Sequence, residues 1–340
     1  MTSNTVRTFV AAVALWALGL ALPQPAAAET HEIRLAKQFS MGYVQFNVLE
    51  HQKLIEKHAA ALGIPDLKVT WATFNGPDAM NTALVSGSVD VVSGGVPGLV
   101  TLWAKTKGTA LAVRGLSALS SQPFLMNTRE ARIKTVKDLT DSDRIAVPAV
   151  KVSVQAVTLQ MAAAQAFGFD KYDKLDALTL SLSPPDATIG LLGGSQTFDC
   201  VFSVPPFQQQ QLENPGIHTV LNSFDVMGGP HTFTVAWTTA KFHDENPTVT
   251  KALMAALAEA TDVINTDKMA AARLWIEDSH SKLSPDFVHN VLAGPQVKWT
   301  LVPENTMKYA EFMHKVGTIK EAPASWKDLF FPEIHAKAGS

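Results

Sequence analysis

The sequence has a single cysteine, Cys200, among its 340 residues. One cysteine excludes an intramolecular disulfide and any metal or iron–sulfur site that needs several cysteines. Charged residues make up only 17% of the chain, and 28 Lys and Arg against 31 Asp and Glu give a net charge of -3. This balance excludes a strongly basic nucleic-acid-binding protein, so we expect no nucleic-acid partner.

The sequence also lacks the motifs of several large enzyme classes. It contains no G-x-S-x-G, G-x-x-x-x-G-K-[ST], H-E-x-x-H or C-x-x-C. Its ten histidines form no i, i+4 pair with acids at metal-binding spacing, so we expect no metal site and no cofactor. Cys200 lies in the strand-like segment 198–202, which favours a small buried residue over a reactive thiol.

No long apolar run reaches the roughly 18 residues that a membrane-spanning helix needs. The run at 9–22 is shorter, follows Arg7, and is followed by Ala26-Ala27-Ala28 before Glu29. This order is typical of a secretory signal peptide with an A-x-A cleavage site, and a membrane anchor is the weaker interpretation. We therefore expect residues 1–28 to be removed near Ala28-Glu29, leaving a periplasmic, monomeric protein.

In the rest of the chain, segments with strand patterns alternate with segments with helix patterns. The first set predicts strands at 32–36, 67–71, 89–92 and 109–114, with helices at 44–62, 77–86 and from about 98 to 105. The second set predicts strands at 145–148, 178–181, 199–204 and 218–221, with helices at 153–167, 184–192 and 207–212. Two such sets predict an α/β fold with two lobes built on parallel-rich sheets.

Two extended segments, 123–127 and 232–238, are predicted to be paired hinge strands between these lobes. After Pro247 the pattern becomes helical, with helices expected at 248–265, 267–278, 285–292 and 303–316. A helical tail after the second crossover would return to the first lobe. We therefore expect a discontinuous first lobe, 29–126 with 228–340, and a continuous second lobe, 127–227.

Candidate ligand-binding residues follow the predicted strands, because ligands of such sheets lie beyond the carboxyl ends of the strands. Gly and Pro there let backbone N–H groups approach a ligand, helix N-termini favour an anion, and aromatic side chains supply apolar walls. The candidates are Gln38, Phe39, Met41, Gly42, Tyr43, Phe74, Asn75, Gly76, Gly94, Gly95, Val96, Lys151, Val152, Ser153, Pro205, Phe207 and His231.

Several of these candidates also have a simpler interpretation. Phe74 and Phe207 could be core residues, and Lys151 could be an ordinary solvated lysine. His231 lies just before a hinge strand, where packing is the favoured interpretation over ligand binding.

The segment 74–91, FNGPDAMNTALVSGSVDV, resembles a segment of the solute-binding proteins of ABC importers of the nitrate/sulfonate/taurine class. These proteins are related to the thiamine-pyrimidine precursor family, and the pattern of their segment is A-x-x-A-L-x-x-G-x-V-D. The strand at 33–36, the segment 135–139 and Asn246-Pro247 agree with the resemblance, which covers nearly all of residues 30–335. It implies a type II periplasmic binding protein fold, in which two lobes close over a solute.

By this resemblance the protein captures a small anionic solute and delivers it to an ABC permease and its ATPase. The aromatic residues of the candidate loops favour an organic anion, a sulfonate or carboxylate that is possibly aromatic, over an inorganic one. Two alternatives stay open: an exported sensor subunit, and an enzyme of the same fold that is desulfinase-like or thiamine-pyrimidine-precursor-like. Those enzymes resemble this chain but carry cysteine in the first cleft loop or in a cysteine-rich motif. Here that loop has Ser40 and Met41, so we expect no enzyme.

Overall fold

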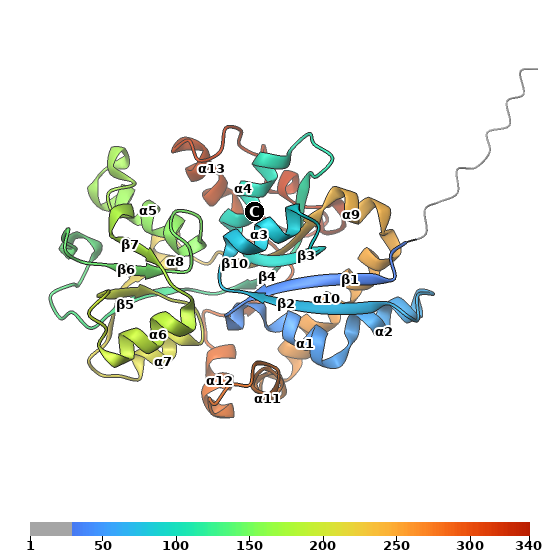
Figure 1. Cartoon of the computed structure of the whole chain (residues 1–340), viewed down its shortest axis with the longest axis horizontal. Helices are drawn as coiled ribbons and strands as arrows, with labels where there is room; N and C mark the ends of the chain where they lie inside the picture. The colour runs from blue at the N-terminus through green and yellow to red at the C-terminus, as the bar shows by residue number, and fades with distance from the viewer. Residues whose placement is uncertain (1–28) are drawn as a thin grey trace, which may run out of the picture.

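The computed structural model describes residues 29–340 and shows an α/β protein with two lobes (Figure 1). The α/β class and the two-lobed arrangement predicted from the sequence are confirmed. The predicted signal peptide, 1–28, lies outside the described residues. No helix in the range 29–340 combines the length and apolar character needed to cross a membrane.

The first lobe, on the right of Figure 1, is built on a six-stranded sheet. In spatial order its strands are β11 (Lys298–Trp299), β4 (Val113–Ser121), β10 (Thr232–Thr239), β3 (Val91–Gly95), β1 (Glu32–Gln38) and β2 (Lys68–Phe74). β1 pairs in parallel with β2 and β3, whereas β10 and β11 pair antiparallel with their neighbours. The sheet is therefore mixed, and its parallel part is the βαβαβ unit expected from the sequence.

The second lobe, on the left of Figure 1, is built on a five-stranded sheet. Its order is β7 (Thr179–Ser181), β6 (Ile145–Val147), β8 (Cys200–Phe202), β5 (Leu125–Thr128) and β9 (His218–Asn222). β6 is parallel to β7 and β8, while β5 is antiparallel to β8 and β9. In both lobes the parallel strands point their carboxyl ends to one edge, where a ligand site is expected.

Helices cover both sheets. Those of the first lobe are α1 (Val44–Gln52), α2 (Leu54–Ala61), α3 (Pro77–Val85), α4 (Val96–Thr106), α9 (Ala240–Glu245), α10 (Pro247–Thr266), α11 (Lys268–Ser279), α12 (Pro285–Leu292) and α13 (Thr306–Lys315). Those of the second lobe are α5 (Val154–Phe167), α6 (Pro184–Gly193), α7 (Phe207–Leu212) and α8 (Ser223–Met227).

Successive side chains along the strands of the first lobe point to opposite faces of the sheet, and a different set of helices covers each face. Leu35, Val91 and Ala236 belong to the core beneath α1, α2, α10, α11 and α12. Their neighbours Val92 and Trp237 belong to the opposite core, beneath α3, α4 and α13. Both faces are apolar because helices bury both, which explains why these strands have no clean polar alternation.

The chain crosses between the lobes twice, and the crossovers differ from the predicted hinge strands. The segments 123–127 and 232–238 do not pair with each other, because β5 belongs to the second sheet and β10 to the first. β10 instead pairs with β4. The crossover at 122–124 follows β4 and the crossover at 228–231 precedes β10, so the two crossovers lie next to each other. The predicted boundary between 126 and 127 falls within β5.

Three predicted elements have different bounds. The helix expected over 44–62 is interrupted at Lys53, which adopts the left-handed conformation (φ 50°) and separates α1 from α2. The strand expected at 109–114 is β4, which begins later and runs through buried serines that the sequence pattern presents as polar. The strand expected at 89–92 is β3, which includes Gly94 and Gly95.

We predict that Lys53→Gly stabilises the protein by about 1 kcal/mol, because a left-handed conformation costs a residue with a side chain roughly that much. Chemical unfolding at neutral pH measures the change. Lys57→Gly, in the middle of α2, is the matched control and should instead destabilise by about 1 kcal/mol. Equal effects of the two substitutions would contradict a left-handed break at residue 53.

Candidate functional site

A small cavity, which we call the inner cavity, lies between the lobes at the carboxyl ends of the parallel strands. From the first lobe it is lined by the loops after β1, β2 and β3, and from the second lobe by the loops after β6, β7 and β8. Its volume is about 30 Å³. The lining residues are Gln38, Phe39, Ser40, Tyr43, Asn75, Pro77, Gly95, Gly98, Pro148, Val152, Ser153, Val154, Gln155, Pro184, Val204 and Phe233.

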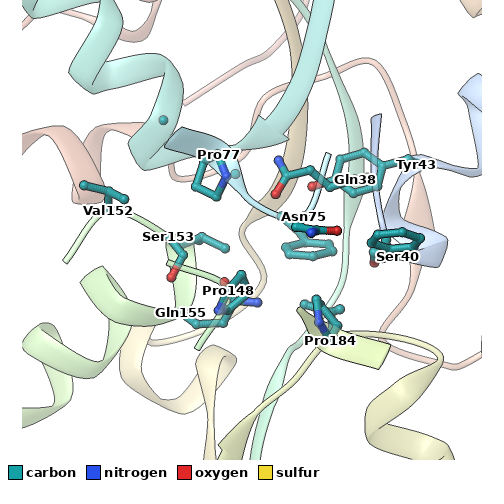
Figure 2. A pocket seen from close by; sticks show the side chains of 16 residues that line it. Gln38, Ser40, Tyr43, Asn75, Pro77, Pro148, Val152, Ser153, Gln155 and Pro184 are labelled. Atoms are coloured by element: carbon teal, nitrogen blue, oxygen red, sulfur yellow. The ribbon is translucent and has the colours of Figure 1, made fainter. Parts of the chain in front are cut away.

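Figure 2 shows the two lobes facing each other across this cavity. Gln38, Asn75 and Pro77, from the first lobe, lie opposite residues of the second lobe that include Ser153 and Gln155. The cavity therefore exists only when both lobes contribute their strand-end loops.

The lobes touch directly around the inner cavity. The Ser40 hydroxyl and the Met41 amide both donate to the Pro205 carbonyl, at 2.9 and 2.8 Å. A Cβ at Gly76 would lie 3.0 Å from the Pro148 carbonyl oxygen, and one at Gly95 would lie 2.6 Å from Val154 Cβ. The ends of β1, β2 and β3 thus each contact the second lobe, so the arrangement is closed.

Two polar side chains of the lining lie mostly in the interior and face the cavity. Tyr43 is 4% exposed and Gln155 is 3% exposed. Neither the Tyr43 hydroxyl nor the Gln155 amide hydrogen-bonds to another residue in the range 29–340. Burial raises the pKa of Tyr43, so its hydroxyl stays protonated and can donate. Both groups are therefore available to hydrogen-bond a polar molecule in the cavity.

Four helices begin at the cavity, and α5 is the one that loses no backbone donor to proline. α3, α4 and α6 carry proline in their first turn, and proline has no N–H to donate. α5 carries none, and the hydroxyl of its cap, Ser153, accepts from the amide of Ala156 and donates to the Ala149 carbonyl. The amides of Val154 and Gln155 therefore lack intrahelical partners and lie at the positive end of the helix dipole.

The polarity of the inner cavity comes from neutral groups. Among the described residues, none that lines it carries a charge. An anion there would be held by the α5 amides and by the donors of Tyr43, Gln155 and Asn75. Such a site neutralises one negative charge far more readily than two, because each buried charge needs compensation.

Seven of the predicted site residues line the inner cavity: Gln38, Phe39, Tyr43, Asn75, Gly95, Val152 and Ser153. Phe207 lines a neighbouring groove that also includes Gln38 and Phe39. The structure places the others outside the lining, namely Met41, Gly42, Phe74, Gly76, Gly94, Val96, Lys151, Pro205 and His231. Met41, Gly76 and Pro205 lie at the contact between the lobes instead.

Two predicted glycines serve packing inside the first lobe. A Cβ at Gly42 would lie 2.4 Å from the ring of Phe233, and one at Gly94 would lie 2.7 Å from the ring of Trp237. The sequence argument was that glycine lets a ligand approach the backbone. In the structure, glycine at these positions makes room for aromatic rings.

His231 is fully buried at the second crossover. Its Nδ1 donates to the Thr232 carbonyl, and its Nε2 accepts from the Ser223 hydroxyl, both at 3.0 Å. Ser223 Oγ in turn accepts from the Phe124 amide at the first crossover. Burial lowers the pKa of His231 to about 4, so the ring is neutral at physiological pH. Its surroundings match the packing interpretation.

The sequence did not single out several lining residues. Pro77, Pro148 and Pro184 could have been found as prolines at predicted strand ends, and Ser40 as part of the first loop. Gln155 and Phe233 had no such signal, because each lies inside a predicted helix or strand. Only the approach of the lobes brings α5 and β10 to the same cavity.

Cys200 lies within β8 and is fully buried, as the sequence predicted. Burial raises the pKa of its thiol to about 12, which keeps the thiol protonated and unreactive. In the part of the chain that the structure describes, no three His, Cys, Asp or Glu side chains are grouped so as to hold a metal ion.

The model of the NMT1-like family matches residues 26–277. The chain belongs to the NMT1-like family. The match includes the strand-end loops of both lobes that line the inner cavity. No curated protein sequence matches this NMT1-like protein significantly.

Solved structures resemble this NMT1-like protein over most of its length. One is the alkanesulfonate-binding protein of Xanthomonas axonopodis pv. citri bound to MOPS, at 18% identity and TM-score 0.67, covering 89% of this chain and 97% of that one. Another is the periplasmic aliphatic sulphonate-binding protein of Escherichia coli, at 18% identity and TM-score 0.63, covering 89% and 92%. The nitrate-binding protein of Synechocystis has 15% identity and TM-score 0.67, covering 87% and 83%.

These similarities confirm the periplasmic binding protein fold and the resemblance noted in the sequence. At such low identity they establish the fold alone, so the ligand must be argued from the cavity.

We predict that the double variant Gly76→Cys, Ala149→Cys forms a disulfide between the lobes. The ideal Cβ of residue 76 lies 3.8 Å from Ala149 Cβ, which is the mean separation in disulfides. Thiol titration after denaturation should then detect Cys200 alone, whereas each single variant should show two thiols. Three titratable thiols in the double variant under oxidising conditions would rule out the closed contact.

We predict that His231 makes the free energy of unfolding depend on pH in the acidic range. Because burial lowers its pKa from 6.5 to about 4, protonation favours the unfolded chain, and stability falls as pH drops from about 6.5 to 4. The loss is about 3 kcal/mol for this shift. Chemical unfolding across this range should show a shallower pH dependence for His231→Gln, while His289→Gln on α12 should match the wild type. If the free energy of unfolding of His231→Gln falls with decreasing pH as steeply as that of the wild type, the buried neutral ring is contradicted.

Proposed function

We propose that this protein is the periplasmic solute-binding component of an ABC importer and that it binds a small organic monoanion between its lobes. One observation carries the proposal: the unpartnered Tyr43 hydroxyl and Gln155 amide face the same cavity as the N-terminus of α5. The relatives named for sulfonate and nitrate binding support an anion.

The neutral lining selects for the charge of the solute. A sulfonate or carboxylate carries one negative charge, which the α5 dipole and three or four hydrogen bonds can offset. Sulfate or hydrogen phosphate would bring two charges into a cavity without a cation, so we expect weak binding of these ions.

The binding cycle rests on movement of the lobes. We propose that a discontinuous first lobe and a continuous second lobe move as two bodies about the crossovers at 122–124 and 228–231. The lobes touch around the inner cavity in this arrangement, so we propose that a solute enters when the lobes separate. The closed protein is then the form that a permease, driven by its ATPase, would recognise.

The contacts of Glu29 and Thr30 are compatible with cleavage of the chain before Glu29. The Glu29 carboxylate accepts the amides of Thr248 and Val249 at the N-terminus of α10, and Thr30 bonds Asn246. Cleavage near Ala28-Glu29 would leave these contacts intact. We therefore propose a mature periplasmic monomer that begins at Glu29.

Binding without catalysis agrees with the cavity, because Cys200 is buried away from it and no lining residue is a paired acid, base or activated nucleophile within 29–340. A solute recovered chemically unchanged after incubation, by mass spectrometry, supports a binding role. Conversion of a sulfinate or a pyrimidine precursor by the purified protein would instead support the related enzymes.

We predict that Tyr43→Phe lowers the affinity for ethanesulfonate or benzenesulfonate about tenfold or more, because a hydrogen bond to a charged group contributes about 1.5–3 kcal/mol. Isothermal titration calorimetry measures the change. Tyr172→Phe, on the surface of the second lobe, is the matched control and should bind like the wild type. Tight binding of nitrate or bicarbonate, with no binding of organic acids, would refute the proposed solute class.

A further inference from the structure

A second, larger hollow lies beside the inner cavity, and we call it the side groove. It is formed by Lys37–Ser40, Asn47, Thr73 and the end of α11 with the segment after it, opposite Pro185, Pro206, Phe207 and Gln210 of the second lobe. It shares Gln38, Phe39 and Ser40 with the inner cavity, so the two spaces adjoin. Like the inner cavity, it is formed by both lobes.

The two spaces differ greatly in size. The inner cavity has a volume of about 30 Å³, whereas that of the side groove is about 630 Å³. Sites for organic ligands occupy about 300–1,000 Å³. The inner cavity is therefore large enough for no more than the head group of an organic acid, and the rest of such a molecule needs the adjoining space.

The walls of the side groove suit an apolar body. Phe39, Phe207, Trp275 and Leu283 contribute apolar surface. Phe39 stands between the two spaces and is 38% exposed, which is unusual for a phenylalanine that packing alone would bury.

The charge of the buried lysine at the side groove is already compensated. Lys37 Nζ bonds the carboxylates of Glu50, at 2.6 Å, and Asp278, at 3.0 Å. Asn47 donates a further hydrogen bond to Asp278. Lys282, which also lines the groove, is exposed at its solvent side.

We infer that the side groove is the subsite for the apolar body of the solute whose anionic group lies in the inner cavity. The inference rests on the proposed function and narrows it: the solute is a monoanion bearing an aromatic ring or an alkyl chain of several carbons. Small inorganic anions would fill the inner cavity and leave the groove empty.

The test is calorimetric titration of the full-length mature protein with unbranched alkanesulfonates from methanesulfonate to hexanesulfonate. Each methylene buried in the groove should raise the affinity about fourfold. Thr73→Trp places a large ring in the groove from the exposed end of β2. It should abolish the gain with chain length while leaving methanesulfonate affinity unchanged. Thr197→Trp, on an exposed loop of the second lobe, is the matched control and should behave like the wild type.

The outcomes separate the two proposals. Methanesulfonate binding with affinity that does not rise along the series overturns the side groove as a subsite and leaves the proposed function standing. A Thr73→Trp variant that retains the full gain with chain length, or that weakens short and long sulfonates equally, also overturns it. Failure of every sulfonate, and of the corresponding carboxylates, to bind overturns the proposed function itself and the subsite with it.

Discussion

The pairing of β10 with β4 is the interaction on which the two-lobed arrangement depends. β4 carries the chain toward the second lobe and β10 returns it to the first, so their adjacency holds both crossovers together. The hydroxyls of Ser120 and Thr234, one on each strand, lie 2.7 Å apart, and both are within hydrogen-bond distance of the Gly42 carbonyl. The same pair therefore anchors the turn that presents Tyr43 to the cavity.

The chemistry of the cleft follows from where proline is placed. Helix N-termini gather at the strand ends because the parallel strands require crossover helices there. Proline in the first turns of α3, α4 and α6 removes one or two backbone donors from each of these termini, whereas α5 loses none. The result is a cavity with backbone donors and no charged side chain among the residues described. Any attraction of an anion to this cavity would have to come from such local groups, since the chain has a net charge of -3.

Local signals predicted the elements well where a cap or a strong pattern was present. Ser153 and Ser183 are the caps of α5 and α6, and α7 has the predicted bounds. The signals failed where long-range contacts override local preference. Of the buried serines of β4, Ser120 hydrogen-bonds the Gly42 carbonyl and the Thr234 hydroxyl, and no sequence pattern reveals that. Lys53 adopts a left-handed conformation because α1 and α2 pack on α10 and α11, a constraint that acts from far along the chain.

The sequence by itself determined the α/β class, the tandem lobes, the strand-end loops and about half of the residues that line the inner cavity. All of these depend on short-range periodicity and turn chemistry. Which loop residues line the inner cavity was decided only by the tertiary structure. The closing of the lobes places protein groups next to Gly76 and Gly95, turns Met41 and Pro205 into a contact between lobes, and brings Gln155 and Phe233 to the cavity. The physical reason is that the site is an interface: its walls come from segments far apart in the chain, and their relative position depends on the packing of two separate cores.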